Sequence, residues 1–127
     1  REKCVARRAV TNTPLQALTL LNDTTFVEAA RVLAERAMRE GGSEPISRID
    51  WVYHQTMGRS PSDAERNLLL ARLDTARTYY REQPEKGAEL LRVGDSPASA
   101  QWPAAELASY AVVMNVILNL DEVVTKE

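Results

Sequence analysis

The chain has 127 residues, of which 44% are hydrophobic and 27% are charged, and this is the size and composition of one folded domain with one core. Sixteen basic against 18 acidic residues give a net charge of −2, which provides no general attraction to nucleic acid or to an anionic membrane. The longest apolar run, residues 110–118, is much shorter than the roughly 20 residues of a membrane span, so we expect neither a nucleic-acid partner nor a membrane span.

The first twelve residues carry an excess of positive charge and no periodic pattern. We expect residues 1–12 to be a basic lead-in from a preceding domain and residues 13–127 to be a single helical domain. The chain begins with Arg1 and shows no signal peptide, so we expect it to be a piece of a longer protein.

The stretch TNTPLQALTLLND, residues 11–23, predicts a two-turn apolar helix. Thr13 suits the N-cap, Pro14 the first helical position, and Gln16 the third, which is a capping-box arrangement. Asn22 can end the helix in a left-handed conformation. The apolar positions at helical spacing are Leu15, Leu18 and Leu21.

Two amphipathic helices are expected next, over residues 24–40 and 45–57. The first has a broad apolar stripe and, on its other side, a ladder of opposite charges that we expect to face solvent. The second has an apolar stripe that leaves Trp51 on the opposite side. The ladder consists of Glu28, Arg31, Glu35 and Arg39, and the inward residues of the second helix are Ile46, Ile49, Val52, Tyr53 and Met57.

The second half of the chain predicts two helices joined at a proline. Ser62 and Glu65 form a capping box, which begins a helix that runs to about residue 82. Pro84 begins a shorter helix that Gly94 closes. The longer helix has one apolar face: Leu69, Leu73, Ala76 and Tyr80.

The last helix begins near Pro103 and is apolar almost all round between Tyr110 and Leu118. A helix without a polar face is typical of the buried centre of a bundle. Its β-branched residues also fit a strand, but no second strand pattern elsewhere could pair with it. We therefore expect an all-α fold, a bundle of five or six helices with the C-terminal helix central.

Residues with catalytic or metal-binding chemistry are few. His54 is the only histidine and Cys4 the only cysteine, whereas a zinc site takes several such ligands and a nucleophilic cysteine needs a nearby base. We expect His54 to be a residue of the surface or of its boundary with the core. The sequence assigns no catalytic, cofactor-binding or metal residue and predicts no cofactor, and it leaves open whether the whole protein is an enzyme.

Trp51 is the clearest candidate for contact with another domain. It lies off the apolar stripe of its helix, and tryptophan is enriched at protein interfaces. Together with the basic Lys3, Arg7 and Arg8, it is expected to meet the preceding domains of the same polypeptide or another protein. The alternative is that the ring packs under the loop at residues 41–45 or against another helix.

Four stretches of the sequence resemble one known family. They are TNTPLQALTLLND, FVEAARVLAERAM, MGRSPSDAE and VILNLDEVVTKE, in this order. Together they resemble the C-terminal region of the DUF1553 (PSD1) family, large proteins abundant in planctomycetes, from Arg7 to Glu127. In that family the region follows a DUF1549 domain, and many members also carry an N-terminal planctomycete-type cytochrome c domain.

The resemblance implies an extracytoplasmic, periplasmic or secreted, multidomain protein of unknown activity. We therefore expect a non-catalytic helical packing or interaction module at the C-terminus of such a protein. Two alternatives remain open: the region contributes part of a site in a polysaccharide-acting enzyme, or it positions a haem domain for electron transfer. The chain itself contains no haem-attachment motif.

Overall fold

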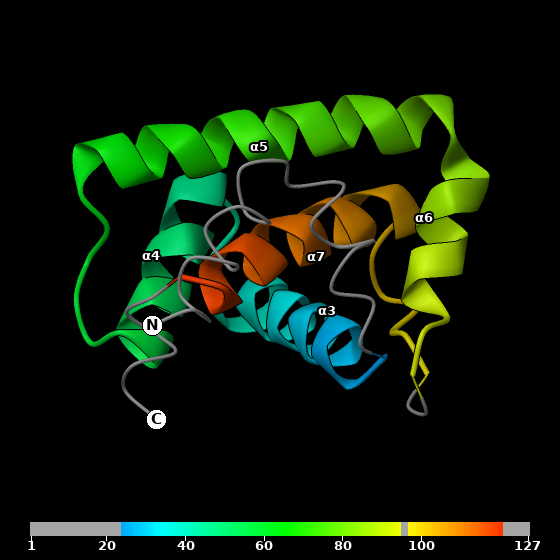
Figure 1. The fold of residues 1–127 in the computed structure, drawn as a ribbon, viewed down its shortest axis with the longest axis horizontal. Coiled ribbons are helices and arrows are strands. Elements are labelled where there is room, and N and C mark those ends of the chain that lie inside the picture. Colours follow the sequence, from blue (N-terminus) through cyan, green and yellow to red (C-terminus); the bar gives the residue numbers. More distant parts are fainter. Residues whose placement is uncertain (1–23, 95–96, 121–127) are drawn as a thin grey trace, which may run out of the picture.

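The computed structural model describes residues 24–94 and 97–120, which form five α-helices (Figure 1). They are α3 (Thr24–Glu40), α4 (Pro45–Thr56), α5 (Asp63–Glu82), α6 (Pro84–Leu91) and α7 (Ala104–Leu118). These described ranges contain no strand, so the all-α prediction is confirmed. The helix expected at residues 13–22, its cap at Thr13 and the division from a lead-in at residue 12 lie outside the described residues.

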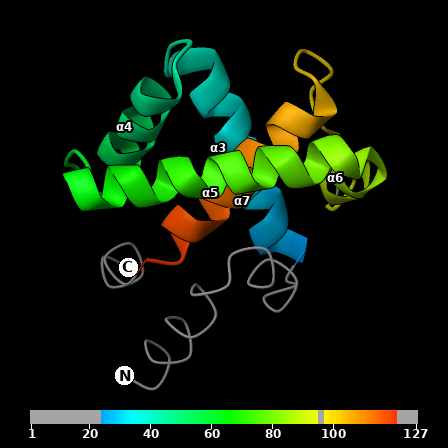
Figure 2. The same ribbon diagram turned by 90° about the horizontal axis from the view of Figure 1, so that it is seen from above.

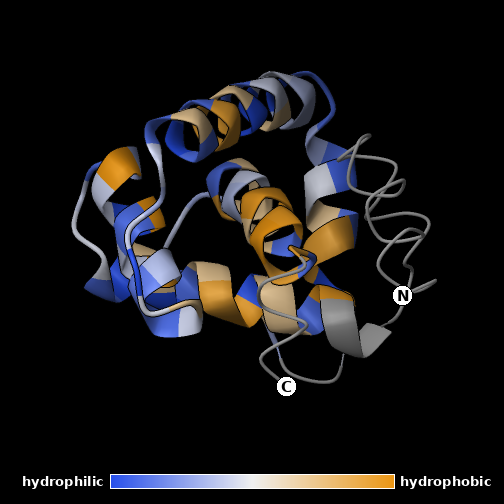
Figure 3. Cartoon of the chain, turned by 60° about the vertical axis from the view of Figure 1, so that its left-hand side comes forward, coloured by the Kyte–Doolittle hydropathy of each residue, from blue (hydrophilic) through white to orange (hydrophobic). Residues whose placement is uncertain are grey.

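The centre of the bundle is α7, as its sequence predicts. This helix lies between α5 and α3 in Figure 1, and it packs against both of them, against α6 and against α4. Every residue from Leu107 to Ile117 is buried. In Figure 3 the central helix is mostly hydrophobic, whereas the outer α5 carries many hydrophilic positions. Because α7 is apolar on all sides, its burial requires neighbours all round it.

The longest of these helices is α5, which crosses over α7 when the molecule is seen from above (Figure 2). Its first turn is held by the predicted capping box. The Ser62 Oγ accepts a hydrogen bond from the Glu65 N–H at 3.1 Å, and Glu65 Oε1 accepts one from the Ser62 N–H at 2.8 Å. The buried residues of α5 are the predicted Leu69, Leu73, Ala76 and Tyr80.

The helix α4 ends where Gly58 adopts a φ of 74°, a left-handed conformation that favours glycine. The prediction of its inward residues is wrong for Ile46, which is exposed. Ile46 lies in the first turn, and the described neighbours of α4 begin to cover its apolar side one turn later, at Ile49. The other predicted residues are buried: Ile49, Val52, Tyr53 and Met57.

The connection from α6 to α7 passes close to α3. Gly94 follows α6 with a φ of 98°, which favours glycine. A Cβ built on Gly94 would lie 2.4 Å from the side-chain Cδ of Glu28 on α3, so a larger residue would also collide there. The loop before α7 is therefore held against α3.

Candidate interaction surface

Trp51 lies on α4, beside the end of α3. Its indole is half-buried and packs partly against the core, and the Arg36 guanidinium lies 5.2 Å from the ring centroid. A Cβ built on Gly41 would lie 3.2 Å from the Trp51 Cβ. Part of the indole is thus used by this chain's own packing, and part remains exposed to solvent.

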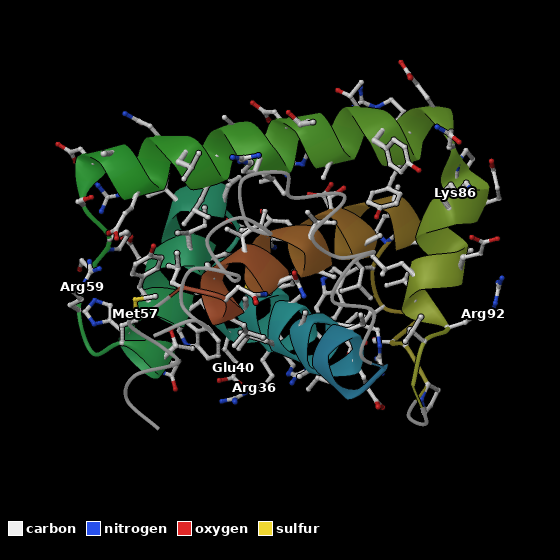
Figure 4. The ribbon with its side chains drawn as sticks, viewed as in Figure 1. Arg36, Glu40, Met57, Arg59, Lys86 and Arg92 are labelled. Carbon is white, nitrogen blue, oxygen red and sulfur yellow. The ribbon has the colours of Figure 1, made fainter. Side chains whose placement is uncertain are left out.

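Of the four predicted interface residues the structure describes Trp51 alone, because Lys3, Arg7 and Arg8 lie outside the described residues. The contact of Trp51 with another domain therefore stays a prediction. Figure 4 shows Arg36 at the lower edge of the molecule, near Glu40, where its side chain points outward.

A shallow groove of about 470 Å³ opens to solvent on this side of the molecule and shares Arg36 with the Trp51 contact. Its walls come from three helices. Among the described residues of its lining, Glu28 and Arg36 are the ionisable ones, and they have opposite charges. A groove of this composition suits an apolar segment of polypeptide. Its lining residues are Glu28, Ala29, Val32, Leu33 and Arg36 of α3, Thr56 of α4 and Leu118 of α7.

Sequence reasoning missed this groove. Leu118 comes more than 80 residues after the α3 residues of the groove in the sequence. The periodicity within one helix cannot predict a contact between residues so far apart. One local signal existed. Val32 is a large hydrophobic residue on the side of α3 that otherwise carries the charge ladder, and it is 39% exposed in the structure.

A cluster of charged side chains ties α3 to the loop before α7. Arg31 is only 1% exposed, so the prediction that it faces solvent is wrong. Its Nη1 donates to Glu35 Oε2 at 2.8 Å and to the Pro97 carbonyl at 3.1 Å. Its Nη2 lies 3.7 Å from Glu28 Oε2. The same Glu35 oxygen accepts the backbone N–H of Ser99 at 2.8 Å.

The burial of Arg31 has a physical reason in the loop that follows α6. Residues 97–99 fold over the guanidinium and supply backbone partners to it and to Glu35. The spacing of the sequence indicates this burial, because Arg31 comes four residues after Val27 and three before Ala34, both of which are buried. Arg31 thus lies on the flank of the apolar stripe.

A second ionic contact links the end of α4 to the start of α5. The Arg59 Nη1 and Nη2 donate to the two carboxylate oxygens of Glu65 at 2.9 and 3.0 Å. These bonds from Arg59, helped by the Ser62 backbone N–H, lower the pKa of Glu65 to about 2. Figure 4 shows Arg59 at one end of the molecule, near Met57.

We expect Glu65→Gln to remove a pH dependence of stability. Because the pKa of Glu65 falls from 4.5 to about 2 on folding, its ion pair contributes fully above pH 4.5 and is lost as the pH falls towards 2. Glu65 is 32% exposed, so solvent screening limits this contribution to about 1 kcal/mol. Glutamine keeps the capping geometry. Urea melts between pH 2 and 7 should show a shallower acid loss in the variant, and parallel curves would contradict the assignment.

His54 is exposed, as predicted, and its Nε2 lies 3.0 Å from Ser60 Oγ. Within residues 24–94 and 97–120, no group of three or more potential metal ligands forms among the His, Cys, Asp and Glu side chains. Of the helices described, none combines the length and the apolar character that crossing a membrane requires. Cys4 lies outside the described residues.

A family model described as "Protein of unknown function (DUF1553)", PSD1, matches residues 1–73. The matched residues contain three of the four stretches that carry the resemblance, together with the α3 and α4 walls of the groove. The fourth stretch, VILNLDEVVTKE, lies beyond them. No curated protein and no solved structure is significantly similar to the chain.

Proposed function

The chain belongs to the DUF1553 (PSD1) family of proteins of unknown function, and we propose that it is a non-catalytic helical module that packs against another domain or binds a partner protein. The resemblance described above supports a position at the C-terminus of a large extracytoplasmic multidomain protein. The partner is then a preceding domain of the same polypeptide or another protein.

The main support for this proposal is the partly exposed pair formed by Trp51 and Arg36. The indole is only half-buried, and the guanidinium that lies over it is itself exposed. Tryptophan and arginine are enriched among the residues that dominate binding energy at interfaces, where partner atoms exclude water from them. A partner that covers this pair would also strengthen the attraction between the cation and the ring, because desolvation strengthens it.

The basic side chains of the lead-in belong to the same proposal. Lys3, Arg7 and Arg8 precede the described helices and give this end of the chain a positive charge. Acidic groups on a partner would complement them and speed its association.

The residues that line the groove favour a packing module over a part of a glycoside-hydrolysing site. Glycosidases use two carboxyl groups that flank the scissile bond. The described lining of the groove contains a single carboxylate, Glu28, and the other ionisable lining residue is the cation Arg36.

The test is the effect of Trp51→Ala in two molecular contexts. In the isolated chain we expect the free energy of unfolding to fall by about 1–2 kcal/mol, because only part of the indole is buried. In a longer protein that includes the preceding domain, we expect a further loss of about 2 kcal/mol, the scale of an interface hot spot. Denaturant melts of both proteins measure the difference.

Leu68→Ala is the control, because Leu68 is an exposed hydrophobic residue on α5. Its effect should be small and equal in the two proteins. Equal losses for Trp51→Ala in both proteins would show that the indole serves only the chain's own stability, and the interface at Trp51 would be rejected.

A further inference from the structure

The groove side of α3 carries opposite charges at equal distances from an apolar centre. Glu28 lies four residues before Val32 and Arg36 lies four residues after it, so these three residues form one row along the helix. We propose that a second copy of this chain occupies the groove, with the two α3 helices antiparallel and a twofold axis beside Val32. This inference concerns self-association and does not rest on the proposed function.

The row is complementary to itself under a twofold rotation. In a symmetric dimer the same surface of both copies meets, so each contact occurs twice. An antiparallel pairing centred on Val32 places Glu28 of each copy opposite Arg36 of the other, because both lie about 6 Å from the centre along the helix. A parallel pairing would place like charges opposite each other, which is unfavourable. The charge pattern thus favours a second copy in the antiparallel direction.

The side chains of the row are placed to reach a second molecule. Val32 is 39% exposed, and the Arg36 side chain points outward at the edge of the molecule in Figure 4. The contact of Arg36 with the Trp51 ring does not use its N–H groups, which can donate to a carboxylate. The Glu28 side chain is 22% exposed, and a carboxylate accepts several donors, so its contact with Arg31 is compatible with a second cation.

The apolar residues around the row form the centre of the proposed interface. Ala29 and Leu33 flank Val32 on α3, and Thr56 and Leu118 line the groove beside them. Contact between two copies removes this apolar surface of both from water. The net charge of −2 on the chain adds little repulsion between copies. Because an interface centred on one helix is small, we expect a weak dimer that forms at micromolar concentrations of the chain.

A cysteine at the centre of the row tests the position of the twofold axis. Val32→Cys, combined with Cys4→Ser, places one thiol of each copy beside the axis, where two Cα atoms can come within disulfide range. We expect oxidised glutathione to convert this variant to a covalent dimer. Leu68→Cys in the same background is the control, because Leu68 is exposed on α5. Equal rates of dimer formation in the two variants would overturn the proposal.

Sedimentation velocity of charge variants tests the ion pairs. Arg36→Glu should raise the dissociation constant of the dimer about tenfold or more, because it creates two like-charge contacts. Glu28→Lys should do the same, whereas an equimolar mixture of these two variants should dimerise, since every contact then joins opposite charges. Arg81→Glu makes the same charge change at an exposed position on α5 and should alter the constant by less than about twofold.

Three results would contradict the second copy as occupant. One is a wild-type chain that remains monomeric up to high micromolar concentration, which would leave the groove to another partner. The second is an Arg36→Glu variant that dimerises like the wild type, and the third is a mixture of variants that does not dimerise. If Glu28→Lys does not fold, Arg36→Glu and the cysteine variants decide the matter.

Discussion

Replacement of Arg31 by alanine is expected to lower the free energy of unfolding by about 3–5 kcal/mol. The side chain is almost fully buried between Glu28 and Glu35, and it donates to the Pro97 carbonyl. Its removal leaves two largely covered carboxylates without the cation between them and takes a donor from the loop. Urea denaturation at neutral pH measures the loss, and a value below about 1 kcal/mol would contradict the structural role.

Two further variants test whether the loss comes from the buried charge of Arg31 and not from the removal of any arginine on α3. Arg39→Ala changes an exposed arginine in the last turn of the same helix, and it should cost no more than about 0.5 kcal/mol. Arg31→Met combined with Glu35→Gln removes the cation and one carboxylate together. The double variant should be more stable than Arg31→Met alone, because a buried charge that has lost its partner destabilises the folded state.

The second large effect is expected at Leu69, where Leu69→Ala should cost about 2–5 kcal/mol. Leu69 is 2% exposed and lies on α5, which packs on α7. Truncation leaves a cavity in the core, since the surrounding helices can relax only in part. Its chain neighbour Leu68 is 47% exposed and provides the matched control.

Leu68→Ala makes the same chemical change one position earlier and should cost about 0.5 kcal/mol or less. Alanine has the higher helix propensity, which offsets part of the lost contact. The two melts are directly comparable because helix, residue type and truncation are the same. Similar losses at both positions would show that α5 does not present the face to α7 that the structure assigns.

Local patterns were sufficient for much of this fold. The apolar stripe and the two glycines that follow it predict α3 from Thr24 to Glu40, as the structure has it. The capping box predicts the start of α5, because Ser62 and Glu65 satisfy each other's backbone N–H groups within one turn. The all-round apolar character of α7 predicts its central position, since a helix of this kind has no side that water can solvate.

The errors arose where contacts with a distant part of the chain determine whether a side chain is buried. Arg31 lies on the flank of the stripe, and its burial depends on a loop more than 60 residues later in the sequence. Ile46 has the spacing of an inward residue but lies in a turn that its described neighbours do not cover. The groove requires Leu118 to meet α3, which no pattern within one helix can specify. These three outcomes depend on tertiary contacts between distant segments.

The central position of α7 has a consequence for the order of events during synthesis. About 80 residues separate the start of α3 from the start of α7, and the ribosome adds them in about 4–16 s. Each of α3, α5 and α6 is thus made before the helix that covers its apolar face. The nascent chain therefore exposes binding sites for chaperones until α7 emerges, and a premature stop before Ala104 would leave those faces exposed permanently.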